Sequence, residues 1–248
     1  MPHPSEATPR PPGDYAGALA TPEPLLLVGG QAINLWALYY ANQTRDLAPF
    51  VSRDVDVLGD RKTLETIGHL SGTKPQFFPL KPPGNEVGVV IAKDSNGHPL
   101  LIEVLRHVLG ASNEELRNPV YHFALGDHHA RVQVPGPIAL LQAKVTNLVE
   151  LKQDGRQDGR HVLILARILP AYLGELTTSV RAGRMAERKL IDYLEHLLAI
   201  VLSPQGRKAW RTLTIDPQHF FTGLSADNLP KLQSFLNKRL PRAIAAKQ

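Results

Sequence analysis

The sequence predicts an α/β domain with a mixed sheet, followed by a helical C-terminal domain. First, the segment PLLLVGG (Pro24–Gly30) is a short apolar run that ends in two glycines, which is typical of a buried strand entering a tight turn. Second, Arg53–Asp60 alternates charged and apolar residues at period two, as a strand with one solvated face does. Third, from Gly136 onward apolar residues recur at helical spacing, and Gly and Pro stand between these segments.

The first domain is expected to cover residues 24–135, after a proline-rich and flexible or extended leader over residues 1–23. Its expected elements, in chain order, are the strand at Pro24–Gly30, a helix at Gln31–Tyr40, an extended loop at Ala41–Phe50, the strand at Arg53–Asp60, a helix at Arg61–Leu70, and strands at Gln76–Leu80, Val87–Lys93, Pro99–Leu105 and Ala130–Val134. The turn signal Ser95-Asn96-Gly97 predicts that the strands on either side of it form a hairpin.

The second domain, residues 136–248, is expected to contain helices at Ile138–Leu151, Val162–Leu169, Ser179–Leu202 and Lys231–Ala246. It also holds the basic character of the chain. Residues 1–151 contain 12 Lys and Arg against 15 Asp and Glu, a net charge of −3, whereas residues 152–248 contain 16 against 8, a net charge of +8. This asymmetry indicates a cationic surface for a phosphate-rich partner, or else the solvated helical surface of a basic protein.

Composition excludes several classes of protein. Hydrophobic residues at 43% and charged residues at 21% are typical of a globular chain and argue against a disordered or fibrous one. The absence of cysteine excludes a disulfide framework, a thiolate metal cluster and a cysteine nucleophile. No apolar run is long enough to span a bilayer, and no G-x-S-x-G or Walker A motif occurs. We therefore expect a soluble, cytoplasmic protein that does not enter a membrane.

Asp54 and Asp56 form the most informative pair. Residues two apart on a strand project from the same face, so both carboxylates are expected on one side of the sheet. Close carboxylates repel each other, and a hard cation such as Mg²⁺ offsets that repulsion while both stay ionised. The alternative is a strand edge with a solvated acidic face.

Gly29 and Gly30 end a predicted strand just before a predicted helix. Glycine lets a phosphate approach the backbone amides of such a turn without meeting a Cβ atom. A plain turn between strand and helix is the alternative. Taken together, the two motifs predict a phosphate-binding turn and a metal-binding carboxylate pair on adjacent strands.

This pattern resembles a known family. Gly29-Gly30, a following helix and then Asp54-Val55-Asp56 resemble the signature of the nucleotidyltransferases of the DNA polymerase β superfamily. More specifically, VGGQAINLW followed by SRDVDVLG is similar to the AbiEii-type, or minimal, nucleotidyltransferases, which are often toxins of toxin–antitoxin pairs. The resemblance implies a polymerase β-like nucleotidyltransferase fold.

The resemblance also implies a third carboxylate on a later strand, and Glu103 in LLIEVL matches it best. A carboxylate within an apolar strand needs a metal or a basic side chain as a partner. An ion pair with Arg106, or an outward-facing edge position, is the alternative to a metal ligand.

A second match lies further along the chain. The segment QAKVTNLVELKQDGRQDGRHVLIL resembles the family's helix–loop–helix, which implies that Lys144 contacts triphosphate oxygens and that Asp158 orients this lysine or the nucleotide. His161 stands where relatives often carry a second acid. Without the resemblance, Lys144 would be read as an exposed helix lysine and Asp158 as a helix N-cap.

The resemblance implies transfer of a nucleoside monophosphate from an NTP to a hydroxyl acceptor, with release of pyrophosphate. The expected ligands of Mg²⁺ or Mn²⁺ are Asp54, Asp56 and Glu103, and the expected nucleotide contacts are Gly29, Gly30, Arg53 and Lys144. Together with Asp158, the three acids and Lys144 form the expected catalytic set. RNA, in particular tRNA, is the expected acceptor, and an antitoxin is an expected partner. The alternatives are a small-molecule nucleotidyltransferase of the antibiotic-modifying kind and an inactive binding protein of the same fold.

Overall fold

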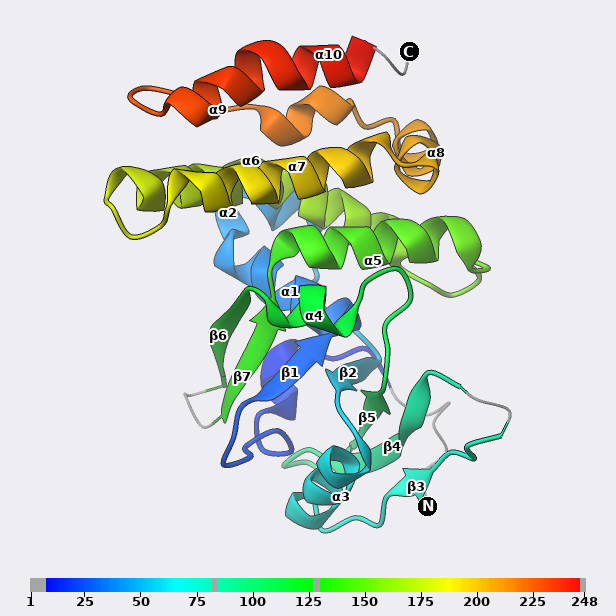
Figure 1. Cartoon of the computed structure of the whole chain (residues 1–248). Coiled ribbons are helices and arrows are strands. Elements are labelled where there is room, and N and C mark those ends of the chain that lie inside the picture. Colours follow the sequence, from blue (N-terminus) through cyan, green and yellow to red (C-terminus); the bar gives the residue numbers. More distant parts are fainter. Residues whose placement is uncertain (1–7, 82–83, 127–129, 246–248) are drawn as a thin grey trace. The chain divides into compact units, whose positions relative to one another are not determined.

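The computed structural model describes residues 8–81, 84–126 and 130–245 (Figure 1). Parts of two predicted segments therefore lie outside the described residues: residues 1–7 of the leader and residue 246 at the end of the last predicted helix. The chain divides into two compact units, Met1–Ala143 and Lys144–Gln248. The division falls within a helix, a few residues after the boundary that the sequence predicts at residues 135–136.

The first unit is built on a seven-stranded mixed sheet with the order β3-β4-β5-β2-β1-β7-β6. Its strands are β1 (Leu25–Val28), β2 (Asp54–Leu58), β3 (Gln76–Phe77), β4 (Glu86–Lys93), β5 (Pro99–Leu105), β6 (Val120–Leu125) and β7 (Ala130–Pro135). The β2–β5 and β1–β7 pairs are parallel, and the other neighbours are antiparallel. The expected α/β architecture with a mixed sheet is thus confirmed, as is the hairpin of β4 and β5.

One row of paired residues crosses five strands. Gln76 pairs with Val89, Val89 with Glu103, Glu103 with Asp56, and Asp56 with Val28. Because directly paired residues project from the same face of a sheet, this row defines one face, which we call the carboxylate face.

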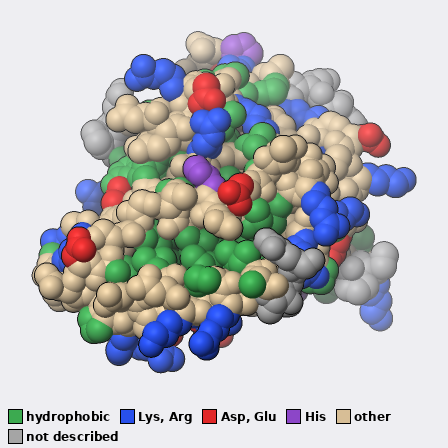
Figure 2. Space-filling model, turned by 90° about the horizontal axis from the view of Figure 1, so that it is seen from above, with side chains coloured by type: hydrophobic (Ala, Val, Ile, Leu, Met, Phe, Trp, Pro, Cys, Tyr) green, Lys and Arg blue, Asp and Glu red, His purple; other side chains and the backbone are tan. Residues whose placement is uncertain are grey.

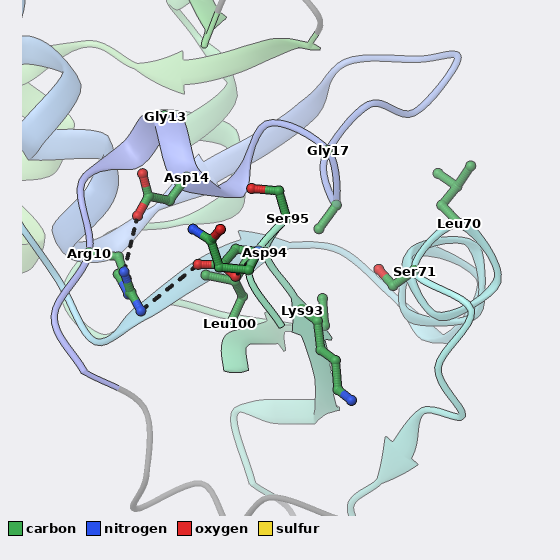
Figure 3. Close-up of a pocket in the computed structure, with 13 residues that line it drawn as sticks. Arg10, Gly13, Asp14, Gly17, Leu70, Ser71, Lys93, Asp94, Ser95 and Leu100 are labelled. Atoms are coloured by element: carbon green, nitrogen blue, oxygen red, sulfur yellow. Dashed lines mark hydrogen bonds and ion pairs between the residues drawn. The ribbon is translucent and has the colours of Figure 1, made fainter. Parts of the chain in front are cut away.

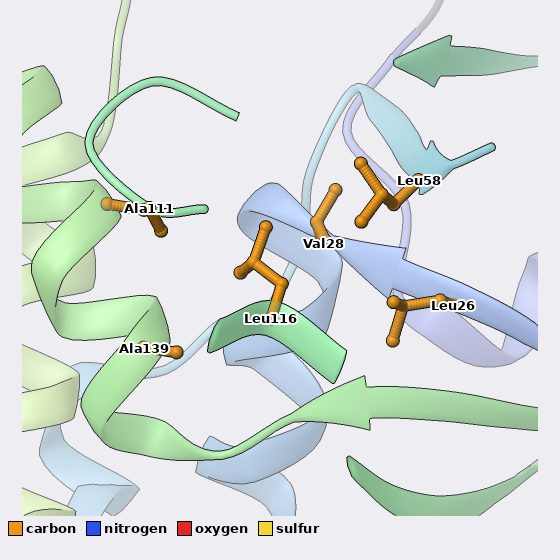
Figure 4. Packing of buried hydrophobic residues seen from close by; sticks show 7 residues of the cluster. Leu26, Val28, Leu58, Ala111, Leu116 and Ala139 are labelled. Atoms are coloured by element: carbon orange, nitrogen blue, oxygen red, sulfur yellow. The ribbon is translucent and has the colours of Figure 1, made fainter. Parts of the chain in front are cut away.

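Beyond the acids, the carboxylate face becomes part of the hydrophobic core. Two strand residues, Val28 and Leu58, pack with Leu116 of α4 (Asn113–Arg117) and Ala139 of α5 (Pro137–Glu150) (Figure 4). The opposite face is covered at β4 by α3 (Arg61–Leu70), whose Leu64 lies over Gly88. The acids therefore lie on a supported sheet, next to a packed core.

The segment from residue 8 to residue 23 is ordered against the sheet, which corrects the expectation of a flexible leader. It contains the 3₁₀ helix η2 (Pro12–Tyr15), and Tyr15 and Leu19 are fully buried. Arg10 forms an antiparallel bridge with Ser52, just before β2. The proline-rich composition fixes backbone angles but leaves Tyr15 and Leu19 as apolar anchors, which the average composition concealed.

Two further expectations need correction in the first unit. Ala41–Phe50 is not an extended loop, because it contains α2 (Ala41–Thr44) and η3 (Arg45–Leu47), and the buried Thr44 hydroxyl donates to two carbonyls at the end of α1 (Gly29–Tyr39). The strand expected at Gln76–Leu80 is only the two-residue β3. Two elements were not predicted: α4 and the edge strand β6, which pairs with β7.

The second unit is helical, as expected. Its helices, besides the end of α5, are α6 (Asp158–Arg181), α7 (Glu187–Leu202), α8 (Pro204–Leu213), η4 (Pro217–Phe221), α9 (Pro230–Ser234), the π-helical η5 (Phe235–Arg239) and α10 (Leu240–Ala245). The helix predicted at Ser179–Leu202 is wrong at its start, because α6 ends at Arg181 and the chain turns at Gly183, whose φ is +69°. The helix predicted at Val162–Leu169 continues through Pro170.

Helix α6 has the length and composition that could cross a membrane, with 24 residues and a mean hydropathy of 1.2. More than half of that apolar stretch, 56%, is buried inside the protein, and Leu165, Leu169 and Leu173 are fully buried. The burial of these side chains is what the core helix of a soluble unit requires.

Candidate metal and phosphate site

The turn at the end of β1 brings the backbone against a carboxylate. Gly29 begins α1 with φ of +64°, a conformation that glycine adopts without strain. A Cβ atom at Gly29 would overlap Asp56 Oδ2 and would lie 2.7 Å from Asp56 Cγ. Two features therefore require glycine at position 29: the positive φ angle and the close approach of the Asp56 carboxylate. The predicted neighbourhood of the glycine turn and the aspartate pair is confirmed.

The three predicted acids share the carboxylate face. Asp54 and Asp56 are two apart on β2, and Glu103 of the parallel neighbour β5 is paired with Asp56. All three side chains are partly exposed. Ser52 Oγ donates a 2.9 Å hydrogen bond to Asp54 Oδ1 and so fixes one oxygen of that carboxylate. The prediction that a later strand brings an acid beside the pair is confirmed.

Glu103 lies in an environment that opposes its ionisation. Its burial, followed by the negative charges of Asp54 and Glu86, raises the pKa of Glu103 from 4.5 to about 7. Arg106, the alternative ion-pair partner, donates from Nη1 to the carbonyls of Gly84 and Glu86 instead. Glu103 is therefore close to half-protonated at neutral pH, which is the range in which a proton acceptor works best.

The donors on the carboxylate face have the chemistry that Mg²⁺ or Mn²⁺ prefers, because all three are hard carboxylate oxygens. Burial and then the negative charges of Asp54 and Glu86 raise the pKa of Glu103, and a nearby cation would relieve the repulsion between Glu103 and Asp54. Within the described part of the chain, however, no three His, Asp or Glu side chains are close enough together to hold a metal ion as they stand. A metal bound by all three acids would require their side chains to turn toward one another.

Two of the other predicted residues, Lys144 and Asp158, lie in the second unit. Lys144 Nζ is 2.8 Å from Asp158 Oδ1, and Arg156 Nε is 2.6 Å from Asp158 Oδ2. Asp158 is buried, which opposes its ionisation, but the charges of Lys144 and Arg156 prevail and lower the pKa of this carboxyl group. Lys144 is itself buried, so it is not the exposed helix lysine of the alternative interpretation. The pairing that the resemblance implied for Lys144 and Asp158 is present.

His161, at the position of the second acid in relatives, is buried beside this cluster. Burial and the charge of Lys144 lower its pKa to about 3, so the ring is neutral at physiological pH. Neither ring nitrogen has a hydrogen-bond partner among the described residues. A neutral imidazole cannot take over the charge of a second carboxylate.

Arg53, predicted as a nucleotide contact, is exposed just before β2, and its carbonyl accepts a hydrogen bond from Tyr15 Oη at 3.2 Å. Burial and then the charge of Asp54 raise the pKa of Tyr15, so its hydroxyl stays protonated and remains a donor. The sequence analysis missed Tyr15, Ser52 and Arg156. Only Arg156 carried a signal, since it stands in the first copy of the repeated QDGR segment.

A polar pocket of about 560 Å³ lies away from the acids (Figure 3). It is lined by η2, the end of α3 and the β4–β5 turn, and Arg10 lies in it between Asp14 and Asp94, at 3.7 and 3.9 Å. Leu101 pairs with Asp54 and therefore projects on the carboxylate face. Leu100, the residue before it, lines the pocket and projects on the opposite face, so the pocket opens on the side of the sheet away from the three carboxylates.

No match was found when the chain was compared with protein-family models, with curated proteins and with solved structures. The family resemblance therefore remains a prediction, and the arguments for a function come from the residues themselves.

Proposed function

We propose that this protein is a metal-dependent nucleotidyltransferase of the polymerase β-like class. One observation carries the proposal: Asp54, Asp56 and Glu103 occupy neighbouring positions on one face of β2 and β5. They lie beside the turn at Gly29, where the carboxylate of Asp56 leaves no room for a side chain. Such a cluster is unfavourable for folding without a cation, and perturbed carboxylates are concentrated at functional sites.

The proposed reaction is an in-line displacement. The oxygen of an acceptor hydroxyl attacks the α-phosphorus of an NTP, the bond from that phosphorus to the bridging oxygen breaks, and pyrophosphate leaves. Glu103, on the same face as the two aspartates, receives the proton of the hydroxyl. The backbone at Gly29 and Gly30 gives the phosphates an approach to the N-terminus of α1. A bound Mg²⁺ or Mn²⁺ would neutralise charge on the phosphates.

Lys144 is proposed to stabilise the leaving pyrophosphate, with Asp158 orienting its ammonium group. This role rests on the family resemblance and on the 2.8 Å ion pair within the second unit. Lys144 and Asp56 belong to different compact units, so their cooperation is best tested functionally. In a double-mutant cycle, the combined loss of activity should be smaller than the sum of the two single losses.

RNA is the proposed acceptor, because residues 152–248 carry a net charge of +8. Lys and Arg side chains are spread around the margin of the face seen in Figure 2, with Asp and Glu among them, and hydrophobic side chains cross its middle. The positive charges that would attract RNA are therefore spread over this face, which suits an acceptor that is recognised by its shape, such as tRNA. A role as a cytoplasmic toxin with an antitoxin partner is part of the proposal on the resemblance alone.

The test is transfer of label from each α-labelled NTP to total RNA in the presence of Mg²⁺. The proposal expects labelled RNA and released pyrophosphate with the wild-type protein, and a loss of at least ~10²-fold for Asp56→Asn. Asp46→Asn, at an exposed aspartate of the same unit, is the matched control and should retain activity. Label found only on a small hydroxyl compound would replace RNA as the acceptor, and absence of Mg²⁺-dependent NTP binding by calorimetry would refute the proposal.

A further inference from the structure

An unusual run of exposed residues follows the short edge strand β3. Every residue from Gln76 to Lys81 is exposed. Phe77, Phe78 and Leu80 are 36%, 40% and 72% exposed, and they account for three of the seven large hydrophobic residues that are exposed among the described residues. Large hydrophobic side chains that are exposed close together along one segment point to a binding role more often than scattered ones do.

The two phenylalanines face opposite sides of the sheet. Gln76 is part of the row that defines the carboxylate face, and Phe78, two residues later, continues the ladder through its N–H bond to the carbonyl of Val87 at 3.0 Å. Phe78 therefore projects on the carboxylate face. Phe77 projects on the other side, where the guanidinium carbon of Arg61 lies 4.0 Å from its ring centroid.

The charges within this segment suit a polyanion, and the adjoining strand β4 carries one acid, Glu86. Lys74 and Lys81 bracket the segment, both are exposed, and the eight residues from Lys74 to Lys81 contain no Asp or Glu. An aromatic ring with flanking lysines is the combination that binds single-stranded nucleic acid, because bases stack on the ring while cations meet the phosphates. A docked polypeptide would instead need polar side chains or carboxylates to match these lysines.

We propose that Phe78 stacks an unpaired base of an RNA strand at the edge of the carboxylate face, with Lys74 and Lys81 contacting its phosphates. Phe78 is three strand spacings of about 4.8 Å from β2 and two residues of about 3.3 Å along the strand from the row that contains Asp56, so the two backbone positions are roughly 16 Å apart. A few nucleotides of extended strand cover that distance. The inference rests on the proposed function, since it identifies how the acceptor would be held, and it limits the acceptor to RNA with an unpaired segment.

The experiment measures binding without NTP, so that it does not depend on transfer. Fluorescence anisotropy compares a labelled 12-nucleotide unpaired RNA with a blunt duplex of the same sequence. Phe78→Ala should weaken binding of the unpaired RNA about 5- to 150-fold, as expected for the loss of one stacked base. Phe77→Ala, the matched control with similar exposure on the other face, should leave binding within about twofold. Phe78→Trp should restore binding and Phe78→Leu should not.

Four results would overturn the inference: equal losses of RNA binding for Phe77→Ala and Phe78→Ala, full RNA binding by Phe78→Leu, equal binding of the duplex and the unpaired RNA, and a Phe78-dependent protein partner with unchanged RNA binding.

A failure of the proposed function would give a different result. If Phe78-dependent RNA binding is found without any label transfer, the reaction is wrong and the RNA surface stands. If transfer to a small compound is found without RNA binding, the surface is wrong and the reaction class stands. Because Phe78 is exposed, its variants are expected to fold, and circular dichroism checks this.

Discussion

Glu103→Gln should remove a pH dependence that the carboxylate face imposes on the stability of the protein. The pKa of Glu103 is about 7 in the folded protein against an ordinary 4.5, so between these values the unfolded chain releases a proton that the folded chain retains. Stability therefore falls as pH rises from about 4.5 to about 7, and it stays lowered above that range. The difference of 2.5 pH units corresponds to about 3 kcal/mol at most, and partial exposure reduces this to roughly 1 to 3 kcal/mol.

The assay is urea unfolding from pH 4.5 to 8.5. Trp36 reports on the first unit, and a Trp210→Phe background removes the tryptophan of the second unit from the signal. Near pH 4.5 Glu103→Gln should match the background protein, because glutamine resembles the protonated acid, and at pH 8 it should be more stable by roughly 1 to 3 kcal/mol. Glu86→Gln removes one of the neighbouring charges and should shift the transition to lower pH.

Parallel stability curves for the Glu103→Gln and background proteins would refute this reasoning, because the acid would then ionise normally in the folded state. The same titration in 10 mM Mg²⁺ tests the proposed cation site. A cation that binds the ionised carboxylates stabilises the folded state by mass action, so Mg²⁺ should recover stability at pH 8 in the background protein and less of it in Glu103→Gln.

Two further predictions follow from the two predicted sites. Gly29→Ala should lower the free energy of unfolding by about 2 to 4 kcal/mol in the same urea assay, because the new Cβ atom clashes with Asp56 and alanine strains a backbone with positive φ. Its control, Gly72→Ala, also has positive φ (+60°) but meets no atom, so it should cost only about 1 kcal/mol. Lys144→Met should cost about 2 to 4 kcal/mol, because it leaves the buried carboxylate of Asp158 with Arg156 as its remaining cation. Its control is Lys152→Met, at an exposed lysine, which should change the thermal unfolding of the protein little.

The local pattern of the sequence predicted most of what positions the site. Period-two alternation at Arg53–Asp60 predicted both β2 and the common face of Asp54 and Asp56, because side-chain direction along a strand depends only on the number of intervening residues. The apolar run around Glu103, after the turn signal Ser95-Asn96-Gly97, predicted β5 as a hairpin partner of β4. The pairing of Asp56 with Glu103 needed the structure, because register between distant strands is a tertiary property.

Misses occurred where a few side chains outweighed average composition. Residues 8–23 are proline-rich, yet the burial of Tyr15 and Leu19 and the bridge from Arg10 hold this segment against β2. The sequence of edge strand β6, VYHFAL, shows no clear alternation of apolar and polar residues, because apolar as well as polar side chains stand at its partly or fully exposed positions. Ser52 gave no signal before the structure, since a hydroxyl next to an aspartate gains meaning only from the 2.9 Å bond between them.

The arrangement on the carboxylate face favours a functional origin over a structural one. If Glu103 served only to stabilise the fold, its partner would be a cation, and Arg106, three residues away, is directed to the carbonyls of Gly84 and Glu86. An apolar residue at position 103 would fit the strand without raising any pKa. The sequence instead keeps an acid next to Asp54 and Asp56, where it opposes folding at neutral pH, and keeps Gly29 free of a side chain beside them. Local costs of this kind are concentrated at sites where a protein binds a ligand, and the ligand that we propose for these groups is a cation together with phosphate.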